Sequence, residues 1–213
     1  MRNAAGIDFT KNSTDTYTAN GGVKGVTSGN FEFSIDTLGS GVSTTEVRAA
    51  GYQYKNHTGA TYTAGDGTHN AAWAGRTAVG NKVENNKLTV TGGSLTTAAY
   101  GGLVQNLEAG SGAGGYKTNG DAAENTLELH TGATVADGYG ADVRAQAGNA
   151  TDNTVDLKGA AVTGNLYAGA LTHASASGAA TGNKVNLYSG TVAGDVYAGF
   201  AAGSGTTTGN TVN

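Results

Sequence analysis

The chain has 213 residues and a net charge of −4, and only 13% of its residues are charged. So mild a charge excludes a protein that holds nucleic acid or an anionic membrane surface through basic residues. There are 37 Gly but neither Pro nor Cys, which excludes a disulfide scaffold and Cys metal sites. No apolar run approaches the roughly 20 residues of a membrane helix, so membrane insertion by this segment is not expected.

Residues 1–85 carry a blurred version of a repeating pattern. "NFEFSID" begins at Asn30, and "EVRAAG" places Arg48 where later units have Tyr. A further degenerate unit is expected between Tyr52 and Arg76, because Asn30 lies two periods before Asn86. We therefore expect residues 1–85 to form degenerate or N-terminal coils of the fold that the later units define.

Residues 86–213 repeat a clear unit of about 28 residues. Three copies align without a gap: "NKLTVTGGSLTTAAYGGL" from Asn86, "NTVDLKGAAVTGNLYAGA" from Asn153 and "NKVNLYSGTVAGDVYAGF" from Asn183. The copy at Asn125, "NTLELHTGATVADGYGADVRAQA", is aligned with a small insertion after Gly132, which places Arg144 at the Tyr position. A fixed period of this size is the signature of stacked repeat architectures.

Each unit contains short segments with alternating apolar residues, separated by Gly, Asn and Ser clusters. Alternation with period two indicates β-strand, and the clusters indicate turns. A unit this short buries its apolar face only by stacking on its neighbours. We predict an all-β fold, a right-handed parallel β-helix with one unit per coil and a single solenoid over residues 1–213. A β-propeller is the alternative, although its blades need about 40 residues.

The pleat of a strand assigns the faces of each coil. Val185 and Leu187 are expected to point inward and to stack on the equivalent residues of the preceding coil, Val155 and Leu157. On the outside, Glu128, Asp156 and Asn186 are expected to align in a column.

The second strand of the unit predicts an outer column of aromatic and basic residues. Val192 and Val196 share one parity, so Tyr197 has the other. The equivalent positions are Tyr100, Tyr167, Arg144 and Arg48. Because a buried unpaired Arg is costly, this column is expected outside, where Arg144 could form a cation–π contact with Tyr167. It is either a shallow strip that grips carbohydrate or protein or a stabilising surface ladder.

The Asn that opens each unit also has two interpretations. It could contribute to a ligand site. It could instead be a turn residue that accepts left-handed backbone angles and stacks with its equivalents into an amide ladder.

Catalytic chemistry is hard to find in the sequence. His57, His69, His130 and His173 have no metal-ligand spacing and are expected to be solvated, so neither a metal nor a cofactor is predicted. Asp142 and Asp195 align as equivalent positions, with Glu46 at the same place before its Val. These acids indicate a preference of the repeat position rather than a catalytic site, and the protein is not expected to be an enzyme.

The unit "N-x-V-x-L-x-x-G-x-V-x-G-x-V-Y-A-G", followed by a polar loop and "T-G-N", resembles the passenger repeats of bacterial autotransporters. The resemblance covers Asn86 to Asn213 well and residues 1–80 poorly. It implies a passenger segment that is exported through the outer membrane and displayed at the bacterial cell surface, attached to the outer membrane in the full-length protein. The signal peptide and the C-terminal barrel of that family are not in this sequence.

Two classes of function stay open. The first is a structural or adhesive surface module that binds a surface glycan or protein. The second is a carbohydrate-active β-helix enzyme, a polysaccharide lyase or hydrolase. The closing "GNTVN" begins a further coil, so we expect this end to stack on more sequence in a longer protein or on another copy of the chain.

Overall fold

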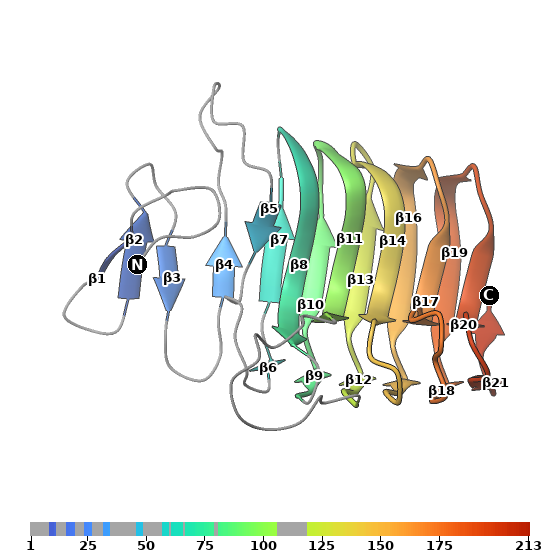
Figure 1. The fold of residues 1–213 in the computed structure, drawn as a ribbon. Coiled ribbons are helices and arrows are strands. Elements are labelled where there is room, and N and C mark those ends of the chain that lie inside the picture. The colour runs from blue at the N-terminus through green and yellow to red at the C-terminus, as the bar shows by residue number, and fades with distance from the viewer. Residues whose placement is uncertain are drawn as a thin grey trace.

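The computed structural model of the protein describes residues 57–59, 61–65, 67–78, 81–105 and 119–213, together with five short strands nearer the N-terminus. The described residues form strands and turns and include no helix. They wind into a parallel β-solenoid of about five turns with coils of about 28 residues (Figure 1). The predicted parallel β-helix architecture is therefore confirmed, and the propeller alternative is wrong.

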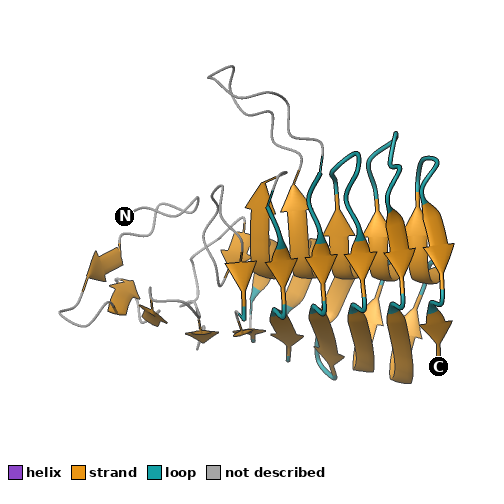
Figure 2. Cartoon of the chain, turned by 90° about the horizontal axis from the view of Figure 1, so that it is seen from below, coloured by secondary structure: helices purple, strands orange, loops and turns teal. Residues whose placement is uncertain are grey.

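Three ladders of parallel strands run along the solenoid and define its three faces (Figure 2). The first face consists of β4 (Glu32–Ser34), β7 (Thr61–Ala64), β10 (Lys87–Val90), β13 (Thr126–His130), β16 (Thr154–Val162), β19 (Lys184–Val192) and β22 (Thr211–Val212). The second face consists of β5 (Glu46–Arg48), β8 (Thr68–Ala78), β11 (Ser94–Gln105), β14 (Thr134–Val143), β17 (Leu166–Leu171) and β20 (Val196–Ala201). The third face consists of β6 (His57–Thr58), β9 (Val83–Glu84), β12 (Ala122–Ala123), β15 (Ala150–Thr151), β18 (Ala179–Thr181) and β21 (Thr206–Thr208).

The described strands nearest the N-terminus pair differently. β1 (Phe9–Lys11), β2 (Thr16–Ala19) and β3 (Lys24–Val26) pair antiparallel in that order, and β3 pairs antiparallel with β4. Parallel pairing begins where β4 pairs with β7 and β5 with β8. The coil that contains β7 and β8 overlaps the range predicted for the degenerate unit.

The predicted inner columns are present on the first face. Leu88, Leu127, Val155, Val185 and Val212 pair in register from coil to coil. The next column contains Val90, Leu129, Leu157 and Leu187. Most of these side chains are fully buried in one continuous cluster with small residues of the second face. Burial of this apolar surface is the main stabilising contribution to a stack of such coils.

A ladder of buried Asn side chains links the coils at the corner before the first face. Asn86, Asn125, Asn153, Asn183 and Asn210 each lie one coil apart. From Asn86 to Asn183, each side-chain amide donates to the Asn Oδ1 of the next coil at 2.8–2.9 Å, and from Asn125 to Asn210 each also donates to a third-face carbonyl. The interpretation of this position as an amide ladder is therefore confirmed.

The left-handed residue of this corner lies one position earlier than predicted. Asn85, Glu124 and Asp152 have φ of 54–55°, and Gly182 and Gly209 have φ of 66–68° in the later coils. The ladder Asn is therefore not the residue with the left-handed backbone. This division explains why the preceding residue varies freely among Asn, Glu, Asp and Gly, because it only has to adopt the turn.

The ladder Asn side chains pack directly against glycines of the second face. A Cβ added to Gly169 would collide with the Asn183 side chain, and one added to Gly199 would collide with the Asn210 side chain. Because interiors are packed without spare room, the "A-G" that follows Tyr167 and Tyr197 is what leaves space for the amide ladder.

The outer column of the first face is a charge network. Glu128, Asp156 and Asn186 pair in register as predicted. Lys158 Nζ lies 2.9 Å from Glu128 and 3.2 Å from Asp156, and Lys87 Nζ lies 3.0 Å from Glu128. Burial raises the pKa of Glu128, but the hydrogen bonds from Lys158 and Lys87 outweigh it and lower the pKa to about 2. The two lysines therefore offset the repulsion between the stacked carboxylates.

Replacing Asn153 by Ala is expected to lower the free energy of unfolding by about 3 kcal/mol, because it leaves buried hydrogen-bonding groups of two coils without partners. The matched control is Asn186→Ala in the outer column of the first face, which is expected to lower the free energy of unfolding by less than about 1 kcal/mol. Urea unfolding followed by circular dichroism measures both. Equal losses in the two variants would contradict a stabilising role specific to the ladder.

Glu128 also predicts how stability depends on acid. Because its folded pKa is about 2 against an ordinary 4.5, its contribution is complete above pH 4.5 and is lost as the pH falls toward 2. The variant Glu128→Gln should be less stable at neutral pH and should show a shallower loss between those two values. Unfolding midpoints measured across this range test it, with the exposed Glu124→Gln as control. A Glu128→Gln profile parallel to that of the wild type would refute the assignment.

Candidate ligand-binding face

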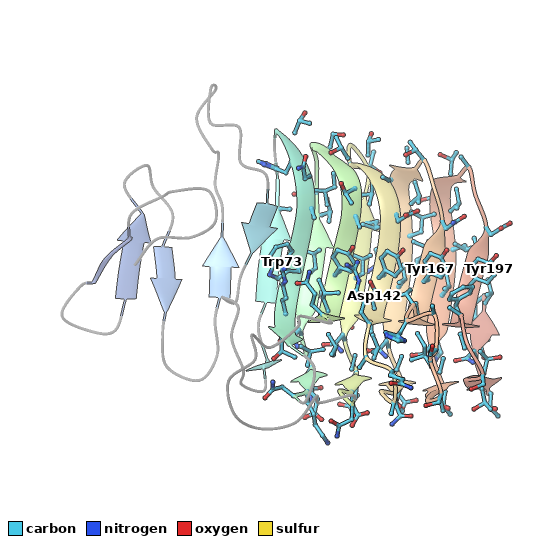
Figure 3. The ribbon with its side chains drawn as sticks, in the orientation of Figure 1. Trp73, Asp142, Tyr167 and Tyr197 are labelled. Atoms are coloured by element: carbon cyan, nitrogen blue, oxygen red, sulfur yellow. The ribbon has the colours of Figure 1, made fainter. Side chains whose placement is uncertain are left out.

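An aromatic column runs along the second face. Trp73, Tyr100, Tyr139, Tyr167 and Tyr197 pair in register through β8, β11, β14, β17 and β20. The preceding residues Ala72, Ala99 and Leu166 belong to the inner core, whereas Trp73 and Tyr100 lie in a separate cluster. The column therefore points outward, as predicted. Figure 3 shows Trp73, Tyr167 and Tyr197 in one row along the solenoid, with Asp142 beside it.

The structure confirms some of the predicted members of this column and not others. Tyr100, Tyr167 and Tyr197 occupy it, and Arg48 of β5 pairs in register with Trp73. The side chain of Arg48 lies outside the described residues. Arg144 is not a member, because Tyr139 holds that position and Arg144 is the first residue after β14.

The error at Arg144 comes from the insertion assumed after Gly132. Without any insertion, the spacing from Asn125 to Tyr139 equals the spacing from Asn153 to Tyr167. The Asn-to-Tyr spacing therefore contained the signal that identifies Tyr139. The "DGYGAD" sequence around Tyr139 makes the alignment hard to recognise, because no apolar residue precedes this Tyr as Leu166 precedes Tyr167.

The tyrosine rings stack almost parallel. Ring centroids are 5.1 Å apart from Tyr100 to Tyr139, 4.8 Å from Tyr139 to Tyr167 and 5.1 Å from Tyr167 to Tyr197, with interplanar angles of 6–14°. This matches the distance between neighbouring strands of a sheet. Tyr139 and Tyr167 thus have another ring on both faces, and they present only edges and hydroxyls to solvent. Phe200 packs against Tyr167 and Tyr197 at 64–68°.

Polar groups hold the hydroxyl ends of the column. Arg144 donates to the Tyr100 hydroxyl at 2.9 Å, and Asn165 donates to the Tyr167 hydroxyl at 3.1 Å. The Tyr197 hydroxyl donates to Asp195 at 3.1 Å. Burial raises the pKa of Tyr100 to about 12 and also raises the pKa values of Tyr139 and Tyr167. The hydroxyls of the column are therefore neutral at physiological pH.

A buried ion pair lies in the column next to the aromatic one, which begins with Arg76 of β8 and has apolar residues on both sides of Asp142. Asp142 occupies the position that Leu103, Ala170 and Phe200 hold in neighbouring coils. It is 1% exposed and accepts hydrogen bonds from Arg144 Nε at 2.7 Å and from the Thr172 hydroxyl at 2.5 Å. Burial raises the pKa of Asp142, while Arg144 and Thr172 oppose this rise.

Two expectations about this region are wrong. Asp142 is not equivalent to Asp195, because Asp195 follows Asn165 and Asp137 in a row linked by hydrogen bonds from backbone N–H to side-chain oxygen. Glu46 does belong to the row of Asp195, since it pairs through Ala71 and Ala98 with Asp137. Arg144 lies over the Tyr100 ring, with Cζ 5.7 Å from the centroid, rather than over Tyr167.

Exposure limits which part of the face a ligand can reach. Trp73 is 1% exposed, Tyr100 5% and Tyr167 9%. Tyr139, Tyr197 and Phe200 are half-buried, and the Arg144 side chain is 37% exposed. The accessible part of the face therefore extends from Arg144 over Tyr139 to Tyr197 and Phe200, with Tyr167 almost covered between its neighbours.

Other chemistry is sparse in the described residues. Among them, no group of three or more His, Cys, Asp or Glu side chains is placed to hold a metal ion. His69 is buried, contrary to the expectation of a solvated side chain, whereas His130 and His173 are partly exposed. The same part of the chain contains no helix long and apolar enough to cross a membrane.

Comparison of the chain with protein-family models, with curated proteins and with solved structures gave no match. What defines the protein is thus its fold and its outer face: a parallel β-solenoid with an amide ladder inside and a tyrosine ladder outside.

The tyrosine ladder predicts a loss of stability in alkali. A folded pKa above the ordinary value of 10 means that the stabilisation is complete below pH 10 and is lost as the pH rises through the folded values, about 12 for Tyr100. Tyr139→Phe keeps the ring in the stack but cannot ionise, so its unfolding midpoint should fall less steeply between pH 10 and 12. Tyr188→Phe, at an exposed position on the first face, is the control. If Tyr139→Phe and the control follow one curve, the hydroxyl of the stacked Tyr139 does not carry the effect.

Proposed function

We propose that the chain is a non-catalytic structural and adhesive module, displayed on the bacterial surface as part of a secreted autotransporter. In this role it binds ligands of host or bacterial surfaces or associates with further copies of itself. The resemblance of residues 86–213 to passenger repeats supports the route of export. The stacked architecture supports a rod that holds a binding face away from the cell.

The observation that carries the proposal is the constant register of the tyrosine column. Tyr100, Tyr139, Tyr167 and Tyr197 pair directly from coil to coil and have the same net spacing from their ladder Asn, although β11 contains a bulge between Leu95 and Ala98. A catalytic cleft requires side chains that converge on one reacting centre. A column that repeats the same aromatic group from coil to coil instead suits extended contact with a surface or polymer.

Hydrogen bonding in the interior supports a role in transmitting force. Each coil is tied to the next by Asn side-chain hydrogen bonds that are shielded from water, in addition to the backbone pairs of three ladders. Shielded hydrogen bonds resist opening because water cannot replace the lost partner. A module that transmits force between a cell and its ligand needs this kind of continuous connection.

The alternative, a polysaccharide lyase or hydrolase, needs acids that are free to exchange protons with a substrate. The most buried carboxylate of the face, Asp142, is 1% exposed and already accepts hydrogen bonds from Arg144 and Thr172. It is thus arranged to hold Arg144 in place. In the neighbouring row, Asp137 and Asn165 accept hydrogen bonds from backbone N–H groups of the following coil, which is a structural arrangement, and Asp195 accepts one from the Tyr197 hydroxyl.

The test is display of the chain on a bacterium that does not itself adhere. We expect cells that display the wild-type chain to adhere to host cells, or to one another, severalfold more than cells that display an unrelated solenoid at equal density. The matched variant Arg144→Gln/Tyr197→Ala should lower this adhesion, and Tyr188→Ala on the first face should not. Reducing-sugar release from polysaccharides by the purified chain would refute the non-catalytic assignment. Unchanged adhesion with wild-type display would refute the adhesive one.

A further inference from the structure

We infer that the accessible part of the second face, from Arg144 over Tyr139 to Tyr197, binds a neutral, linear polysaccharide that lies along the solenoid axis. The inference rests on the proposed adhesive function and adds the chemical class of the ligand. It follows from four observations: a positioned donor, a row of acceptors, the local charge and the repeat of the tyrosine rings along the axis.

Arg144 is a positioned hydrogen-bond donor. Its Nε is held by Asp142 at 2.7 Å and one of its terminal nitrogens by the Tyr100 hydroxyl at 2.9 Å. A guanidinium has five N–H donors in a rigid plane, so these two bonds fix its orientation and leave others for a ligand. The Arg144 side chain is 37% exposed and lies over the Tyr100 ring, so its remaining donors are open to a ligand at that end of the accessible face. Two hydroxyls of one sugar fit such a fork without reorganisation of the protein.

Acceptors follow the other side of the tyrosine column. Asp137, Asn165 and Asp195 form a row of side-chain oxygens along the axis, and the row becomes more exposed toward Asp195. The hydroxyls of Tyr167 and Tyr197 bond the Asn165 and Asp195 side chains of this row. A ligand on the face would therefore meet donors, acceptors and ring edges together, which suits a molecule that carries many hydroxyls on an apolar ring.

The charge of this region disfavours an anionic ligand. Among the described residues of β14, β17 and β20 and those directly beside them, Asp137, Asp142 and Asp195 carry up to three negative charges, against the positive charge of Arg144, which is already paired with Asp142. A phosphate, a uronate or a nucleic acid backbone would be repelled by the uncompensated acids. A neutral polysaccharide brings no charge into the site and still uses both the donors and the acceptors.

The repeat of the face favours a linear ligand over a compact one. The tyrosine rings recur every 4.8–5.1 Å, and their faces are covered by neighbouring rings. A single sugar therefore cannot stack on an inner ring in the usual way. Affinity therefore has to come from the ring edges and hydroxyls of several coils together. A chain molecule that lies along the axis contacts several coils, whereas a compact molecule does not.

Isothermal titration calorimetry with hexasaccharides of cellulose, chitin and xylan as neutral probes, and with hexagalacturonate as the anionic probe, tests the inference. We expect the wild-type chain to bind at least one neutral probe, to bind it more tightly than its disaccharide, and to bind hexagalacturonate more weakly. Arg144→Lys keeps the charge but loses the fork, and should weaken binding about tenfold. Tyr139→Phe/Tyr197→Phe keeps the rings and should weaken it by a similar factor.

The control is Tyr188→Phe on the first face, which should bind like the wild type. Unfolding midpoints verify that each variant is folded before its affinity is compared. If adhesion is found on display but no neutral probe binds, or if hexagalacturonate binds more tightly, the carbohydrate inference fails while the adhesive function stands. Binding that Arg144→Lys and the double Phe variant leave unchanged would also overturn it, because the ligand would then lie elsewhere.

Discussion

The buried Asn ladder is the interaction on which the rest of the structure depends. A stack of short coils rich in Gly and Ala buries little apolar surface per coil, so its register must be fixed by something more directional. The Asn side chains supply this, because each amide can satisfy its bonds only when the next Asn lies directly above it. A coil shifted by one residue would leave these amides unpaired in the interior and would turn the inner Leu and Val columns outward.

The outer face inherits its order from this ladder. The spacing from the ladder Asn to the Tyr is identical in four consecutive coils (86 to 100, 125 to 139, 153 to 167 and 183 to 197), whereas Asn-to-Asn distances are 39, 28, 30 and 27 residues. The variation in length therefore falls entirely after the Tyr. Parallel stacking at about 5 Å requires this constant net spacing, since one uncompensated residue would turn a ring from the outer to the inner side. The local register shifts between Asn and Tyr, such as the one between Leu95 and Ala98, are compensated before the Tyr is reached.

Much of this could be predicted from the sequence, because it follows from local periodicity. The columns of Val155 and Val185 and the outward direction of Tyr197 need only the alternation of a strand and the repeat length. The predictions that were wrong concern contacts between side chains of different coils. Nothing in the run around Arg144 indicates that its guanidinium reaches back to Tyr100 or that Asp142 is buried beneath it. The left-handed corner was assigned one residue late, since Asn is a common residue for both roles.

The stacking that stabilises the outer face also restricts what the face can do. Rings that cover one another are lost as stacking platforms, so the tyrosines offer a ligand only their edges and hydroxyls. Specificity then has to come from groups that break the repeat, and on the described part of this face Asp142 and Arg144 are such a break. Burying the Asp142 carboxylate costs free energy, whereas Leu and Ala fill the same position in the neighbouring coils. The contribution of Asp142 therefore lies in how it orients the exposed guanidinium of Arg144.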